Sequence, residues 1–271
     1  MATVLLVRHG RTTANAGGVL AGWTPGIGLD EVGHAQASAL RDRLAGLRLV
    51  RAVSSPLQRC LETAALVLGN VRDPAHEQVV LDERLGECRY GDWTGRPLVE
   101  LATEPLWRTV QGHPSAATFP GPGGESVRAM QYRAVTAVRE HDEQVTAEHG
   151  PDALWMVFSH GDIIKVLLAE ALGVHLDLFQ RIVVGPASVS VVRYTPWRPL
   201  VLHLNDTGSD LRALAAGPTT AVVGGGDIPE AGARHTPPDQ DTSSATASGT
   251  APVPSAHTTT GGNHAHPAPL A

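Results

Sequence analysis

The sequence is poor in cysteine and has no long hydrophobic run. Its two cysteines, Cys60 and Cys88, show neither the spacing of a metal site nor the density of a disulfide framework, so we expect a reducing compartment. No apolar run approaches the roughly 20 residues that a membrane helix needs. The first residues carry neither the charged leader nor the apolar stretch of a signal peptide. We therefore expect a soluble, cytoplasmic protein without a membrane partner.

Positive charge is also scarce. Lys165 is the only lysine among 271 residues, and the formal net charge is −6 with histidine neutral. A broad basic surface for nucleic acid is therefore excluded. No Gly-x-x-x-x-Gly-Lys sequence is present, and the glycines of 121–124 include a proline and follow no expected strand, so nucleotide-binding loops are not indicated. We expect no cofactor and no metal, and arginine would have to bind any phosphate.

Composition changes near residue 206. From Thr207 onward the chain is mostly Ala, Gly, Pro, Ser and Thr, which gives too little apolar bulk to offset the entropy lost on ordering. The sequence therefore predicts a folded domain over residues 1–206 and a disordered low-complexity tail over 207–271. The pattern identifies no oligomer interface.

Strand and helix patterns alternate within the first part. Short apolar runs predict strands at 3–7, 49–53, 78–81, 154–158, 188–194 and 200–204. Helical spacing predicts helices at 34–47, 125–148 and 162–172, and a further helix starting at Ser55-Pro56, with serine as the cap and proline at the first helical position. This alternation predicts a three-layer α/β/α sandwich around a mostly parallel central sheet, with ligands at the carboxyl ends of the strands.

Three polar clusters follow expected strands. They are Arg8-His9-Gly10, Ser54-Ser55-Pro56 followed by Arg59, and Ser159-His160-Gly161. Glycine lets the backbone approach a ligand closely, and arginine donates to anionic oxygens. If Arg59 were only a surface charge, it would pair with Glu62 across one helical turn.

These residue types suit phosphoryl transfer. The reaction needs cationic groups around the phosphate oxygens and an in-line nucleophile, and an unprotonated imidazole can serve as that nucleophile through a covalent phosphohistidine. A carboxylic acid must protonate the leaving oxygen and later deprotonate water. Glu87, in the glycine-containing stretch 85–95, is the candidate, although Asp82, Glu83 and Asp92 are close in sequence.

The ordered motifs resemble the histidine phosphatase superfamily, the phosphoglycerate-mutase-like group. The resemblance runs from residue 3 to about 206 and is specific, because several motifs occur in the family's order. These are Arg8-His9-Gly10, Gly22-Trp23, the stretch 29–37, Ser54-Ser55-Pro56 with Arg59 and 62–64, Glu87 before Tyr90-Gly91, the stretch 124–126, and Ser159-His160-Gly161.

The resemblance implies a role for each matching residue. His9 is expected to be phosphorylated, Glu87 to donate the proton, and Arg8, Arg59 and His160 to form the phosphate pocket. Asn15 is expected to contact the phosphate, and backbone groups near Gly22 and Gly161 to line the site. Residues 1–206 would form the catalytic domain, acting on a small-molecule phosphomonoester. Arg11 stands where many relatives carry Glu or Gln, which bears on the substrate rather than on the chemistry.

Three functions fit such a site. A metal-independent phosphatase transfers the phosphoryl group to water, whereas a phosphoglycerate-mutase-type enzyme transfers it between substrate hydroxyls. A mutase needs additional cationic groups and a substantial closing segment to exclude water. Residues 96–124 are short, contain five prolines and have only Arg96 and Arg108 as basic residues, which favours the phosphatase. The third function, an inactive module that binds phosphorylated ligands, predicts loss of His9, His160 or Glu87, and all three are present.

Overall fold

A computed structural model of the chain describes residues 1–69, 79–208, 220–221 and 227–228. Its main sheet has six strands in the order β3-β2-β4-β1-β5-β6. The strands are β1 (Thr3–Arg8), β2 (Leu49–Ser54), β3 (Val80–Leu81), β4 (Leu154–Ser159), β5 (Val189–Arg193) and β6 (Leu200–Asp206). The helices are α1 (Thr13–Ala16), α2 (Glu31–Arg43), α3 (Gln58–Leu68), α4 (Leu98–Leu101), α5 (Pro105–Gly112), α6 (Val127–His149) and α7 (Gly161–Ala171), and the 3-10 turns are η2 (Glu83–Leu85), η3 (Gly91–Trp93), η4 (Pro114–Ala116) and η5 (Leu176–Arg181).

The sheet is mostly parallel, as the sequence predicts. β1 pairs in parallel with β4, and β2 pairs in parallel with both β4 and β3. β5 is antiparallel to β1, and β6 is antiparallel to β5, so β5 is the strand of the six that runs against the others. The central β1 therefore ends beside β4 with both carboxyl ends at one edge.

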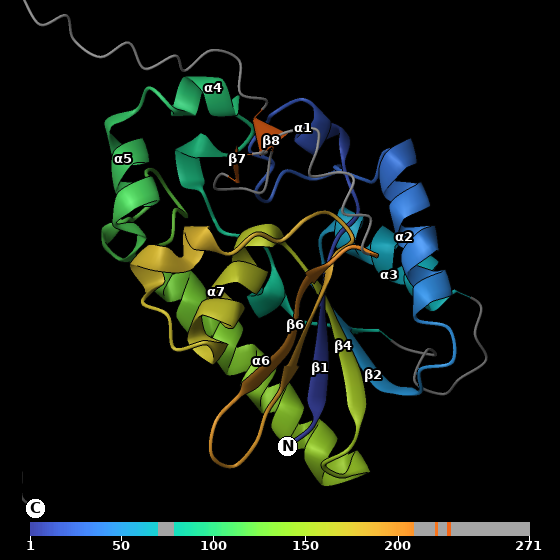
Figure 1. Cartoon of the computed structure of the whole chain (residues 1–271). Helices are drawn as coiled ribbons and strands as arrows, with labels where there is room; N and C mark the ends of the chain where they lie inside the picture. The colour runs from blue at the N-terminus through green and yellow to red at the C-terminus, as the bar shows by residue number, and fades with distance from the viewer. Residues whose placement is uncertain (70–78, 209–219, 222–226, 229–271) are drawn as a thin grey trace, which may run out of the picture. The chain divides into compact units, whose positions relative to one another are not determined.

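Helices cover both faces of the sheet (Figure 1). Side chains alternate along a strand, so Leu5 and Val7 of β1 pack with the α2–α3 layer, whereas Val4 and Leu6 pack with the α6–α7 layer. The predicted three-layer α/β/α sandwich is confirmed.

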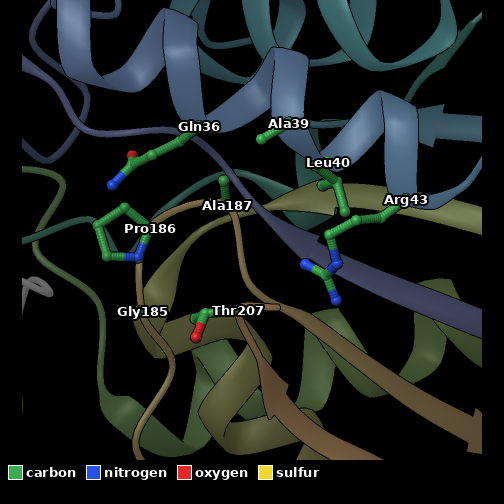
Figure 2. A pocket seen from close by; sticks show the side chains of 8 residues that line it. All are labelled: Gln36, Ala39, Leu40, Arg43, Gly185, Pro186, Ala187 and Thr207. Atoms are coloured by element: carbon green, nitrogen blue, oxygen red, sulfur yellow. The ribbon is translucent and has the colours of Figure 1, made fainter. Parts of the chain in front are cut away.

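A pocket of about 270 Å³ lies between α2 on one side and residues 185–187, before β5, with Thr207, after β6, on the other (Figure 2). Gln36, Leu40 and Arg43 of α2 line one side, and the loop that contains Pro186 and Ala187 lines the other. The Ala187 N–H donates to the carbonyl of His9 at 3.1 Å, so this loop also fixes the end of β1.

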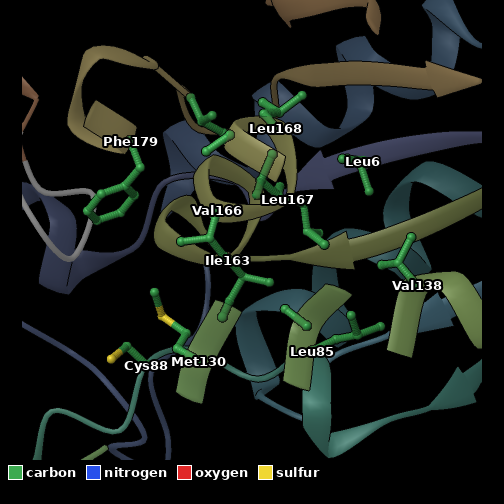
Figure 3. Close-up of a cluster of buried hydrophobic side chains, with 14 of the residues drawn as sticks. Leu6, Leu85, Cys88, Met130, Val138, Ile163, Val166, Leu167, Leu168 and Phe179 are labelled. Carbon is green, nitrogen blue, oxygen red and sulfur yellow. The ribbon is translucent and has the colours of Figure 1, made fainter. Parts of the chain in front are cut away.

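The larger core lies between the sheet and the α6–α7 layer (Figure 3). Leu6 of β1 lies near Ile163 and Leu167 of α7, with Val138 of α6 beside them. Burying each such side chain contributes about 2 kcal/mol. The core thus holds α7 rigidly against β1 and β4.

Side-chain caps mark the first residues of α2 and α6. Asp30 accepts from the Gly33 N–H and starts α2, and Ser126 accepts from the Ala129 N–H and starts α6. The prediction that Ser55 caps the next helix is wrong, because α3 begins at Gln58 and its cap residue, Leu57, makes no side-chain bond. The Ser55 hydroxyl accepts from the Leu57 N–H at 3.3 Å, ahead of the helix, and also contacts His160 Nε2 at 2.8 Å.

The predicted tail, 207–271, lies almost wholly outside the described residues. The structure describes in it residues 207–208 and a short antiparallel pair, β7 (Thr220–Ala221) and β8 (Asp227–Ile228). The predicted strand at 78–81 is seen as β3, and Gln78 lies outside the described residues. In the described part of the chain, no helix is both long and apolar enough to cross a membrane.

Candidate active site

The three polar clusters meet at one edge of the sheet. The register aligns Arg8 with Ser159 and Ser54 with Phe158, so the carboxyl ends of β1, β2 and β4 are adjacent. The His9 N–H donates to the Ser159 carbonyl at 3.0 Å, which continues the ladder one residue past β1. Residues about 150 positions apart in sequence are therefore neighbours.

The His9 ring has a defined tautomer. Its Nδ1 lies 2.7 Å from the Gly10 carbonyl, and because a carbonyl oxygen only accepts, Nδ1 carries the proton. Its Nε2 accepts from Nε of Arg59 at 3.3 Å. Burial lowers the pKa of His9 well below its ordinary value, and the charges of Arg59 and Arg8 lower it further. The ring is therefore neutral, with the Nε2 lone pair directed toward the arginine.

The turn after His9 is tied to α3. The Gly10 N–H donates to the Thr63 hydroxyl at 3.0 Å, and that hydroxyl donates to the Arg59 carbonyl at 2.7 Å. A Cβ at position 10 would lie 2.6 Å from the Gly33 carbonyl oxygen, so only glycine fits this turn. Thr63 thus connects the turn after His9 to the backbone of Arg59.

Both predicted phosphate-binding arginines are buried. Arg59, in the first turn of α3, donates through Nη2 to the Gly22 carbonyl at 2.9 Å and is 2% exposed. Arg8 donates to the Val184 carbonyl at 2.6 Å. Glu62 contacts Gln58 and the Leu29 N–H instead of Arg59, so the surface ion pair is not formed. Two guanidinium groups therefore lie in the interior near His9.

The second histidine caps the helix that follows β4. His160 is the N-cap residue of α7, and its Nε2 lies 2.8 Å from the Ser55 hydroxyl. Its ring lies 5.3 Å from that of His9, centroid to centroid, in an edge-on arrangement. Burial lowers the pKa of His160 well below its ordinary value, with the Arg59 charge as the next cause. Both imidazoles are thus neutral at neutral pH.

Glu87 is the buried acid of its loop. Its side chain accepts from the Cys88 N–H at 2.9 Å, and the residue is 3% exposed. Burial raises the pKa of Glu87 to about 7, the charge of Asp162 adds to this, and Arg59 opposes it. Such a carboxyl group can carry a proton at neutral pH. By contrast, Asp82 pairs with Arg84, and the Glu83 carboxyl group is 77% exposed.

Side chains far away in sequence fix the backbone of the Glu87 loop. The Trp23 indole N–H donates to the Glu87 carbonyl at 2.6 Å, and Nη2 of Arg133 donates to the same oxygen at 3.0 Å. The Ser159 hydroxyl holds the Leu85 carbonyl at 2.7 Å. Trp23 and Ser159 stand within recognised motifs, whereas Arg133 carries no sequence signal of its role.

The other predicted site residues lie around this centre in different ways. Asn15 Oδ1 accepts from the N–H and the hydroxyl of Thr12, so that atom belongs to the cap of α1. Gly22 has φ +49° and presents its carbonyl to Arg59. Gly161 is the first residue of α7. Arg11 pairs with Asp30 at 2.7 Å, and its side chain is half-buried.

The described residues contain no group of three or more His, Cys, Asp or Glu side chains arranged to hold a metal ion. Positive charge near His9 comes from Arg8 and Arg59, which can neutralise phosphate oxygens. A neutral imidazole, two buried guanidinium groups and a protonatable carboxyl group are together the residue types that phosphoryl transfer requires.

Known proteins share the fold and the sequence pattern. A glucosyl-3-phosphoglycerate phosphatase from Mycolicibacterium vanbaalenii is 32% identical over 176 residues, which cover 64% of this chain and 76% of the relative. A 2,3-bisphosphoglycerate-dependent phosphoglycerate mutase 2 from Gloeobacter violaceus is 29% identical over 170 residues, 63% of this chain and 75% of the relative. The structure of Bacillus stearothermophilus YhfR matches with a TM-score of 0.66 and 27% identity, and covers 76% of this chain and 98% of that protein.

The family pattern itself extends across the sandwich. The model of the histidine phosphatase superfamily (branch 1) matches residues 4–207, about three-quarters of the chain, and the named relatives include both phosphatases and a mutase. The resemblance inferred from the ordered motifs is confirmed: this chain belongs to the histidine phosphatase superfamily, branch 1.

Proposed function

We propose that the chain hydrolyses small phosphomonoesters without a metal ion, by way of a phosphohistidine on His9. The observation that carries this proposal is the state of the His9 ring, whose Nδ1 proton is bound by the Gly10 carbonyl while Nε2 keeps its lone pair next to Arg59. A neutral, oriented imidazole among buried cations is what an in-line attack on phosphorus requires.

Substrate binding replaces contacts that the site residues make with one another. The phosphate oxygens take donors from Arg8 and Arg59, and the Arg59–His9 contact opens as the phosphate enters. His160, bonded to Ser55, completes the pocket on the α7 side. The amide of Asn15 and the backbone near Gly22 and Gly161 line its edge. These groups hold the phosphorus in line with Nε2 of His9.

The first step forms the covalent intermediate. Nε2 of His9 attacks phosphorus, an N–P bond forms, and the P–O bond to the leaving group breaks. The proton of the Glu87 carboxyl group passes to the leaving oxygen, which departs as an alcohol. The raised pKa of Glu87, about 7, supports this role because the acid still carries its proton at neutral pH.

The second step restores the enzyme. The Glu87 carboxylate takes a proton from water, the water oxygen attacks phosphorus, and the N–P bond breaks to release inorganic phosphate. His9 regains its lone pair and Glu87 its proton, so the cycle consumes one water for each ester.

A phosphoglycerate-mutase-type transfer is the second candidate, supported by the relative named a mutase. Its weakness is in the segment between Glu87 and α6. The helices α4 and α5 there are short, with four and eight residues, and Arg96 is engaged with Glu104 at 2.8 Å. A mutase would need cations to hold a second phosphate. The phosphatase relative also supports hydrolysis.

The test measures phosphate release across a panel of phosphorylated metabolites, with isomerisation of 3-phosphoglycerate assayed alongside. His9→Ala is expected to reduce turnover by at least roughly 10³-fold. His203→Ala, which removes an exposed imidazole on the edge strand β6, is the matched control and should keep full activity. Rapid quenching of the wild-type enzyme with a labelled ester should trap label on His9. Near-normal turnover of His9→Ala would defeat the proposal, and isomerisation without net phosphate release would favour the mutase.

A further inference from the structure

A buried carboxylate that takes no part in the proposed chemistry lies in the first turn of α7. Asp162 is two residues beyond His160 and is almost fully buried. The Tyr90 hydroxyl donates to its Oδ2 at 2.9 Å, and the ammonium of Lys165 lies 3.5 Å from its Oδ1. Lys165, the single lysine of the sequence, is buried as well. Burying three ionisable groups together costs desolvation free energy, which their ion pair and hydrogen bonds must offset.

This cluster connects the acid to the second histidine. Tyr90 follows Glu87 by three residues on the same loop, and Asp162 lies on the helix that His160 caps. The Tyr90–Asp162 hydrogen bond therefore joins the Glu87 loop to α7. Lys165 is fixed by Gln180, whose Oε1 accepts from its ammonium at 3.0 Å. The carboxylate of Asp162 is thus positioned by the hydrogen bond from Tyr90 and by the ion pair with Lys165.

The electrostatic consequence falls on Glu87. A nearby negative charge disfavours ionisation of a second buried carboxyl group. After burial, Asp162 is the largest cause that raises the pKa of Glu87, and Arg59 is the largest that lowers it. The titratable and charged groups that interact with Glu87 come from several elements. They are Arg8 at the end of β1, Arg59 and Cys60 of α3, Cys88 and Tyr90 of its own loop, Arg133 of α6, and Asp162 and Lys165 of α7.

We propose that Asp162 is the positioning residue for the acid Glu87: its charge, held by Tyr90 and Lys165, keeps the proton on Glu87 until the leaving oxygen takes it. Without this charge, burial alone would oppose Arg59 and Arg8, and the pKa of Glu87 would fall. Asp162 itself neither gives nor takes a proton. The inference rests on the proposed function, in which Glu87 protonates the leaving group.

The test is the pH dependence of kcat/KM in Asp162→Asn, which keeps an acceptor for Tyr90 but removes the charge. With an alkyl phosphate, the leaving alkoxide needs the proton of Glu87, so the alkaline limb is expected to move to lower pH by roughly one unit. With p-nitrophenyl phosphate, the phenolate leaves without that proton, so the limb should move much less. An unchanged profile on the alkyl phosphate would overturn the inference.

Two controls separate charge from packing. Glu83→Gln removes a carboxylate near the same loop, but that carboxylate is exposed and screened by solvent, so the limb should stay in place. Tyr90→Phe keeps the Asp162 charge and the buried ring while it deletes the hydrogen bond, so turnover should fall without the displacement seen in Asp162→Asn. An equal displacement in Tyr90→Phe would show that packing, not charge, acts on Glu87, and would contradict the proposal.

Asp162→Asn leaves a buried ammonium without its counter-charge and can fail to fold. The double variant Asp162→Asn/Lys165→Met removes both charges, and because Asp162 is the stronger influence on Glu87, the limb should still move to lower pH. Trapping phosphohistidine in each variant distinguishes the two proposals. A variant that traps phosphohistidine with an unshifted limb overturns the role of Asp162 alone, whereas a wild-type enzyme that never forms phosphohistidine overturns the proposed function.

Discussion

Nε of Arg59 donates a hydrogen bond to Nε2 of His9 at 3.3 Å, although the two residues are 50 positions apart in the sequence. The contact occupies the lone pair that the proposed reaction uses, and it is made by a group that the phosphate would engage. This contact therefore orients the neutral His9 ring, and in the proposed reaction an anion would replace it. Burial is the largest cause of the lowered pKa of both His9 and His160, and the charge of Arg59 is the second largest.

Arg59→Lys keeps the positive charge but loses the planar fork that contacts His9 and the Gly22 carbonyl together. Losing a charged hydrogen bond of this kind is worth about 1.5–3 kcal/mol, so kcat/KM should fall roughly 10- to 100-fold. Steady-state kinetics on a good phosphomonoester substrate measures this. Arg41→Lys, which alters an exposed arginine paired with Asp42, is the control and should stay within about twofold. A kcat/KM of Arg59→Lys equal to that of the wild type would mean that the positive charge alone, without the planar fork, is enough for activity.

Glu87→Gln should stabilise the protein at alkaline pH. The folded-state pKa of Glu87, about 7, lies above its unfolded value, so its contribution to stability is full below the unfolded pKa and is lost as the pH rises through about 7. Above that range the buried carboxylate is charged, and replacing it should raise the free energy of unfolding by up to about 3 kcal/mol. Urea unfolding at about pH 5 and about pH 8 measures the difference, which should appear at the higher pH only. An equal effect of Glu87→Gln at the two pH values would refute the link between stability and ionisation of Glu87. The control, Glu83→Gln, should leave the free energy of unfolding unchanged at either pH.

Leu6→Ala tests how far the core below the site stabilises the fold. Leu6 is 1% exposed on β1, the strand that leads into Arg8 and His9, and the substitution should destabilise the protein by about 2–5 kcal/mol. Leu202→Ala changes the same side chain on β6 where it is 51% exposed, and should alter stability by less than about 1 kcal/mol. The midpoints of urea unfolding compare the two. Equal losses would place the stabilising core elsewhere.

Excess chelator should leave phosphate release unchanged, because Arg8 and Arg59 supply the positive charge in the proposed pocket. The measurement compares initial rates before and after prolonged dialysis against chelator. Strict dependence of the rate on an added divalent ion would contradict the arginine-based pocket.

The family, the layered fold and the order of the strands along the chain could all be inferred from the sequence. The spacing of apolar residues, the glycine turns and the Arg-His-Gly and Ser-His-Gly motifs each lie within a few consecutive residues, so local sequence is enough to recognise them. The same stretches predicted His9, Arg59, Glu87 and His160 as one site. The capping role given to Ser55 failed because α3 begins three residues later, at Gln58. The Ser55 hydroxyl accepts from the Leu57 N–H and contacts His160, and the local pattern does not reveal the contact with a distant side chain.

The hydrogen bonds and protonation states of these residues could not be inferred from the sequence. The tautomer of His9, the contact between Thr63 and Gly10, and the use of Arg133 to hold the Glu87 loop depend on side chains brought together from separate strands and helices. Protonation is decided in the same way. Burial and charge are properties of the assembled interior, so the pKa of Glu87 is raised only once the core excludes water and α7 brings the charge of Asp162 near.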